Sequence, residues 1–245
     1  AKIARCQFID NGQEGSVFFE NIGGTMTQCV SRLNRLDGFN FGTSAFAIPL
    51  DCSIVGCWSD QDGNGIIELG DPVDPPFNIG ASGIFTTRPG LTIVGCVITR
   101  ATATGIAVEG QDEAPLSQAE NVSIVGCILR NNGASAIGIG DNLGSQISIL
   151  GRRVAISGCS IHDGPADGIR LQTPAGNPFG GVPSECAITG CVIEGHLGAA
   201  KVGILELNSG GGNPDFNCIV GNVVRNNTVA ITTVGVNTIV ASNRV

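Results

Sequence analysis

Between residues 91 and 99 the chain contains Leu91-Thr92-Ile93-Val94-Gly95-Cys96-Val97-Ile98-Thr99, and this pattern returns along its whole length. Two short β-branched segments flank a Gly-Cys pair, a combination typical of two strands joined by a sharp bend. The copies near both ends are more divergent. The recurring position is held by Cys6, Cys29, Cys57, Cys96, Cys127, Cys159 and Cys191, and then by Asn222 and Asn243.

A repeat that runs from end to end predicts a solenoid. Successive repeat positions are 21 to 39 residues apart. The shortest spacing suits one turn of a three-sided parallel β-helix, and the longer spacings add an inserted loop. In the central unit we expect strands at 91–94, 97–99 and 105–109, and in two other units we expect Glu68 and Gly138 at outward positions of the third strand. The sequence therefore predicts an all-β solenoid of about eight coils with an inward Cys/Asn ladder.

These residues carry a resemblance to right-handed parallel β-helix proteins, the pectate-lyase-like superfold with its short parallel β-helix repeats. In that family an inward asparagine ladder often occupies a bend, as Asn222 and Asn243 would here, and cysteine replaces asparagine in the other coils. The resemblance covers essentially the whole chain and implies the fold. It implies little about chemistry, because one superfold hosts many functions.

The ten cysteines invite a disulfide interpretation, which their placement opposes. Neighbours in a stacked column lie about 4.8 Å apart with parallel Cα–Cβ vectors. This leaves their Cβ atoms wider apart than the roughly 3.5–4.5 Å that a disulfide prefers. We therefore expect buried free thiols that pack as small hydrophobes. Cys186 and Cys218 share a second phase if one deletion is allowed, and they are the pair most compatible with a disulfide.

The two ends of the chain fall at almost the same phase of the repeat, and neither carries an amphipathic capping helix. Solenoids need polar caps, because an uncovered end exposes apolar rungs and unpaired strand edges. We interpret residues 1–245 as a single β-helix domain without evident end caps and as a segment of a longer β-helix. The alternative is that a partner covers the ends, with head-to-tail stacking as one form.

Charge and hydropathy exclude two classes of function. The net charge is −8, and no basic cluster exceeds Arg152-Arg153, whereas a nucleic-acid surface needs a concentrated basic stripe. No apolar run approaches the roughly 18–20 residues of a membrane span. We expect neither nucleic-acid binding nor a membrane span.

The segment 60–71 fits the D-x-D-x-N-G-x-I-x-x-x-D pattern of an EF-hand or dockerin calcium loop. Such a loop needs oxygen ligands at positions 1, 3 and 5, a carbonyl at 7 and a carboxylate at 12. The competing interpretation is an Asp/Asn/Gly turn at a β-helix corner. The predicted calcium ligands are Asp60, Asp62, Asn64, the carbonyl of Ile66, and Asp71.

The third strand carries the most suggestive outward side chains, because the resemblance implies a substrate groove over it. In the expected register Arg170 and Glu206 are neighbours on adjacent coils, near His162 and Asp167 on the preceding turn. A lyase or epimerase needs a base and a group that neutralises the uronate carboxylate. We predict Arg170 as the base with Glu206 and Asp167 as partners. The competing interpretation is a salt bridge beside a polar turn, and Glu194 and His196 are expected on a solvated surface turn.

Exposed aromatic platforms, which sugar sites usually offer, are scarce, since the chain has one Trp and no Tyr. The sequence therefore favours a non-catalytic extracellular or cell-surface module, such as a fibre, adhesion or scaffold element. Its partners would be a polysaccharide, or itself through open coil ends. The alternative is a polysaccharide lyase or epimerase that acts on an acidic glycan with calcium.

Overall fold

The computed structural model describes residues 2–11, 15–17, 23–34, 36–42, 52–62, 82–109, 119–133, 144–173, 182–197, 201–208 and 212–245. All regular secondary structure in these ranges is β-strand. No helix that could cross a membrane is found among them.

The strands form three parallel sheets. The first sheet contains β1 (Lys2–Ala4), β4 (Gly24–Thr27), β7 (Cys52–Val55), β10 (Thr92–Val94), β13 (Ser123–Val125), β16 (Ala155–Ser157), β19 (Ala187–Thr189), β22 (Cys218–Val220) and β25 (Ile239–Ala241). The second contains β2 (Gln7–Ile9), β5 (Val30–Arg32), β8 (Trp58–Asp60), β11 (Val97–Thr99), β14 (Ile128–Arg130), β17 (Ser160–His162), β20 (Val192–Glu194) and β23 (Val223–Arg225). The third contains β3 (Ser16–Val17), β6 (Phe39–Phe41), β9 (Ser82–Thr86), β12 (Thr104–Val108), β15 (Ser145–Ile149), β18 (Asp167–Thr173), β21 (Val202–Asn208) and β24 (Val229–Thr232).

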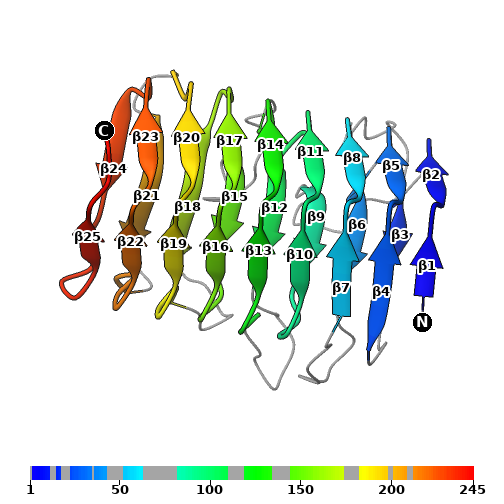
Figure 1. Cartoon of the computed structure of the whole chain (residues 1–245), viewed down its shortest axis with the longest axis horizontal. Coiled ribbons are helices and arrows are strands. Elements are labelled where there is room, and N and C mark those ends of the chain that lie inside the picture. The colour runs from blue at the N-terminus through cyan, green and yellow to red at the C-terminus, as the bar shows by residue number, and fades with distance from the viewer. Residues whose placement is uncertain are drawn as a thin grey trace, which may run out of the picture.

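Each coil contributes one strand to each sheet, and the coils stack along the long axis with the two termini at opposite ends (Figure 1). This is the right-handed parallel β-helix of about eight coils that the repeat predicts. Every strand hydrogen-bonds to the equivalent strands of the neighbouring coils, so a residue's phase in the repeat fixes the direction of its side chain.

The bend between the first two sheets depends on one residue with a left-handed backbone. Gly95 has φ of 59°, and a Cβ built on it would meet no heavy atom within 4 Å. The conformation itself, rather than lack of space, therefore favours glycine. Gln28 and Ser242 hold the same position with φ of 53° and 54°. The copies of the pattern near the ends therefore keep the bend without a glycine.

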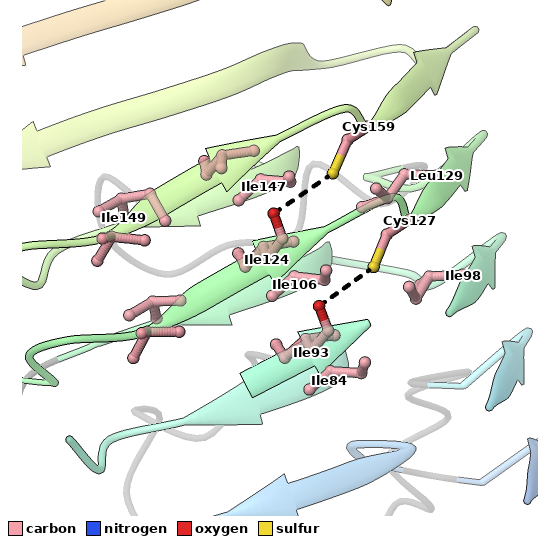
Figure 2. Packing of buried hydrophobic residues seen from close by; sticks show 14 of the residues in the cluster. Ile84, Ile93, Ile98, Ile106, Ile124, Cys127, Leu129, Ile147, Ile149 and Cys159 are labelled. Carbon is pink, nitrogen blue, oxygen red and sulfur yellow. Dashed lines mark hydrogen bonds between the residues drawn. The ribbon is translucent and has the colours of Figure 1, made fainter. Parts of the chain in front are cut away.

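The cysteine that follows this residue points into the interior. All ten thiols are free, and those from Cys29 to Cys191 in the recurring position are buried. Figure 2 shows Cys127 and Cys159 donating to the carbonyls of Ile93 and Ile124 in the preceding coil.

Asn222 also bonds to the preceding coil, and its hydrogen bonds are shorter than those of the thiols. Its Oδ1 accepts the main-chain N–H of Cys191 at 2.9 Å, and its Nδ2 donates to the carbonyl of Ile188 at 2.9 Å. Cysteine in seven coils and asparagine in the last two thus occupy one position, which requires a small side chain facing the interior.

The Cys186–Cys218 pairing that one deletion would allow is wrong. Cys218 pairs in register with Ala187 and is half-buried, whereas Cys186 lies one residue earlier in the repeat and faces the interior. Burial raises the pKa of the Cys186 thiol to about 11. Adjacent side chains on a strand point to opposite faces, so these two sulfur atoms cannot meet.

The core is a set of aliphatic columns that run along the axis, one or two from each sheet. Ile93, Ile98 and Ile106 come from the three sheets of one coil and are fully buried. Figure 2 shows side chains from the three sheets meeting in one interior. A fully buried Ile side chain contributes about 1.5–3 kcal/mol, so stability accumulates coil by coil.

The register of the third sheet differs from the expected one. In two coils its strands are β9 and β15, so Phe85 and Ser148 occupy the outward column where Glu68 and Gly138 were predicted. Residues 63–81 and 134–143 lie outside the described residues. In the sequence, residues 66–69 and 136–139 show the alternation of a strand, but the segments that follow each insertion show the same alternation. The outward column is Asn40, Phe85, Ala107, Ser148, Arg170, Leu205 and Thr232.

Candidate functional site

Arg170 lies on the outward face of the third sheet and is nonetheless buried. Its Nε donates to Asp167 Oδ2 at 3.0 Å, its Nη2 donates to the same oxygen, and its Nη1 donates to Gln172 Oε1 at 3.3 Å. Asp167 is buried as well, so the ion pair is shielded from water. The structure thus brings two of the predicted catalytic residues together.

Asp167 also has an architectural task, because its Oδ1 accepts the main-chain N–H of Val202 on the next coil at 2.9 Å. Asp37 repeats this arrangement at the other end of the sheet. Its Oδ1 accepts the main-chain N–H of Ser82 at 2.7 Å, and its Oδ2 accepts from Asn40 Nδ2 at 3.0 Å. A carboxylate at the start of the third-sheet strand thus binds a main-chain N–H of the next coil in both places. The coil of Asp167 differs because it also carries the guanidinium of Arg170.

Glu206 does not join Arg170, so the predicted neighbourhood is wrong. Glu206 pairs in register with Leu171, which points inward, whereas Arg170 pairs with Leu205. The Glu206 carboxylate is fully buried. It accepts from Asn217 Nδ2 at 2.8 Å, from Thr238 Oγ1 at 2.9 Å and from two main-chain N–H groups. This residue joins the last coils of the helix.

His162 lies on the second sheet, at the end of β17, and so on a different face from Arg170. Its Nδ1 lies 3.1 Å from Glu194 Oε1, and its Nε2 is hydrogen-bonded to Ser160 Oγ. Glu194 is half-buried, and His196, expected on the same solvated turn, is fully buried. His196 Nδ1 lies 2.9 Å from the Ala166 carbonyl, and burial lowers the pKa of its imidazole.

Glu109 is a site residue that the sequence analysis did not single out. It follows β12 on the outward side of the third sheet, two coils from Gln172 in the same column. Burial raises the pKa of its carboxyl to about 7. The described part of the chain offers its side chain no hydrogen bond or ion pair. A lone carboxylate after an apolar strand was the only signal in the sequence.

The calcium prediction is only partly within the described residues. Asp60 accepts from Arg100 Nε at 2.9 Å and from Arg100 Nη2 at 2.7 Å, on the outward side of β8. Asp62 is fully buried and accepts from the main-chain N–H and the Nδ2 of Asn34 at 3.0 and 2.7 Å. The two carboxylates share no partner and serve opposite sides of the coil wall. The other predicted ligands, Asn64, Ile66 and Asp71, lie outside the described residues.

Metal-binding side chains are not clustered in the part of the chain that the structure covers. There, no group of three or more His, Cys, Asp or Glu residues is placed to hold an ion.

The fold defines the protein as a right-handed parallel β-helix. No protein-family model matches the sequence, and no curated protein matches it. The chain is similar to the A-module of the mannuronan C-5 epimerase AlgE4 of Azotobacter vinelandii, with 17% identity, a TM-score of 0.70, and coverage of 98% of this chain and 57% of that one. It is also similar to the Dettilon tailspike protein, with 13% identity, a TM-score of 0.55, and coverage of 91% and 42%.

The chain spans little more than half the length of the epimerase module. At these identities the likeness establishes the fold alone.

Proposed function

We propose that this protein acts on an acidic polysaccharide, as a uronate epimerase or lyase, over the outward face of its third sheet. The observation that carries the proposal is the buried Arg170–Asp167 pair on that face, with the carboxyl of Glu109 two coils away. The likeness to a mannuronan C-5 epimerase supports this enzymatic alternative more than the non-catalytic module that the sequence favours. We place the protein outside the cell, where such polymers occur.

The chemistry of a uronate requires two functions that this face can supply. The C5 proton becomes removable when a cation neutralises the adjacent carboxylate, and Arg170 is a fixed cation. A group with a pKa near the working pH then takes the proton, which suits Glu109. Return of a proton to the opposite face of C5 gives epimerisation, whereas departure of the C4 oxygen gives an unsaturated end.

Glu109 and Arg170 lie on the same face, two coils and so about 10 Å apart along the axis. Glu109 is also two positions further along its strand, in the column of Leu150 and Gln172. We place one uronate residue of the substrate between them. In this arrangement Arg170 neutralises the substrate carboxylate rather than acting as the base, because a guanidinium cannot accept a proton and Asp167 and Gln172 orient it. Glu206 has no part in it.

The proposal is tested by incubating the protein with polymannuronate, polyguluronate and polygalacturonate. Proton NMR detects changed configuration at C5, and ultraviolet absorbance detects unsaturated ends. We expect one of these products, and a loss of about 100-fold or more in rate for both Glu109→Gln and Arg170→Lys. Arg32→Ala, an exposed arginine on the second sheet, is the matched control and should leave the rate unchanged. No product from any polyuronate by a folded wild-type protein would overturn the proposal.

A further inference from the structure

The outward face of the second sheet carries a second cluster of reactive side chains, separate from the third-sheet site. Ser160 and His162 belong to β17, and Glu194 ends β20 in the next coil. The Ser160 hydroxyl donates to His162 Nε2, and His162 Nδ1–H donates to Glu194 Oε1 at 3.1 Å. These are the nucleophile–base and base–orienter contacts of an activated serine.

The β-helix itself produces this alignment. Ile161 points into the core, so Ser160 and His162, at alternate positions, both point outward. His162 pairs in register with Glu194, which places the carboxylate beside the imidazole on the neighbouring coil. Nothing in the local pattern Ser-Ile-His indicates the third member, because Glu194 is one complete coil away.

Electrostatics favours the protonation states that this chemistry needs. Arg225 Nε donates to Glu194 Oε2 at 2.6 Å, and this ion pair lowers the pKa of the Glu194 carboxyl. An ionised Glu194 holds the imidazole proton on Nδ1. The lone pair of Nε2 is then directed at the serine hydroxyl, as a general base requires.

The neighbouring rungs supply the rest of a shallow site. Ile128 and Val192 flank Ser160 in register and offer an apolar surface for a small acyl chain. Arg130 flanks His162 and is exposed. Its guanidinium has no hydrogen bond or ion pair within the described ranges, so it is free to stabilise an oxyanion.

We propose that Ser160, His162 and Glu194 form a serine-hydrolase site for small carboxylic esters. The Ser160 oxygen attacks the ester carbonyl while its proton passes to His162 Nε2. That proton then leaves with the alkoxide, which departs as the alcohol, and the acyl group stays on Ser160. Water, deprotonated by the same nitrogen, releases the carboxylic acid and restores the serine. This activity lies outside the proposed function and does not depend on it.

Two measurements test this site. A fluorophosphonate probe followed by peptide mapping reports whether Ser160 is nucleophilic, and hydrolysis of p-nitrophenyl acetate reports turnover. We expect labelling at Ser160, loss of both signals in Ser160→Ala, and rates about 100-fold lower in His162→Gln. Glu194→Gln should lower both rates at least about tenfold, because it removes the charge that fixes the imidazole tautomer.

The matched control is Ser157→Ala, which removes a half-buried outward serine on the first sheet and should change neither rate. Circular dichroism of each variant establishes that it is folded. Absence of the probe from Ser160 in wild type, or labelling that His162→Gln leaves unchanged, would overturn the proposal. Such a result would show the three residues to be a surface hydrogen-bond ladder.

Discussion

Replacing Glu206 by Gln should destabilise the protein strongly, although the change keeps size and shape. The two carboxylate oxygens accept from Asn217 Nδ2, from Thr238 Oγ1 and from the N–H groups of Val234 and Gly235. An amide keeps one oxygen and turns its NH2 group toward the other pair of donors. Two bonds to a buried charged acceptor are then lost, at about 1.5–3 kcal/mol each. We expect unfolding in urea to require at least about 3 kcal/mol less free energy.

The effect should also be local. Hydrogen exchange should accelerate most in residues 229–245, because Glu206 ties this last part of the chain to the preceding coil. Glu185→Gln is the matched control: Glu185 is half exposed, and its ion pair with Arg153 should cost about 1 kcal/mol or less. A Glu206→Gln variant as stable as this control would refute the assignment of Glu206 as a structural carboxylate.

Three further predictions concern the interior. Asn222→Ala should lower the free energy of unfolding in urea by about 2–4 kcal/mol, because it leaves buried main-chain groups such as the Cys191 N–H without partners. Asn222→Cys should lower it by less. Equal losses in the two variants would contradict the idea that cysteine can replace asparagine at this position. Burial lowers the pKa of His196, so near pH 6.5 the unfolded chain binds a proton that the folded chain does not. The stability of the protein is therefore fully present above that pH and falls as the pH drops below it. His196→Asn should reduce the difference in Tm between pH 7 and pH 5. Ellman's reagent should reach only Cys6 and Cys218 in the native protein and the other eight thiols after unfolding; fast reaction of more than two would count against the buried ladder.

The fold could be predicted from the sequence because solenoid packing repeats one local rule. Every coil needs a left-handed residue followed by a small inward side chain, and the Gly95-Cys96 pair shows both requirements directly. Handedness and coil number then came from the resemblance and from the spacing of that pair. Whether the third strand of a coil precedes or follows the inserted loop was harder to predict, because the sequence on both sides of the loop shows the alternation of a strand.

The sites could not be predicted with the same accuracy, because each depends on register between coils. A shift of one position separates Arg170 from Glu206 and turns the latter into the interior. His162 was singled out, but its partner Glu194 was assigned to solvent because sequence separation hides a contact made across one coil. Glu109 became notable only through the raised pKa of its half-buried carboxyl, which no pattern of residues reveals.

The central claim is that the outward face of the third sheet carries out proton transfer at C5 of a uronate. The most direct measurement is loss of the C5 proton signal of polymannuronate in heavy water, because an epimerase exchanges this proton for deuterium and a lyase removes it as the C4–C5 double bond forms. The account predicts loss of this signal with wild type and with Arg32→Ala, and a loss about 100-fold slower with Glu109→Gln. A rate of loss that Glu109→Gln leaves unchanged would contradict the claim.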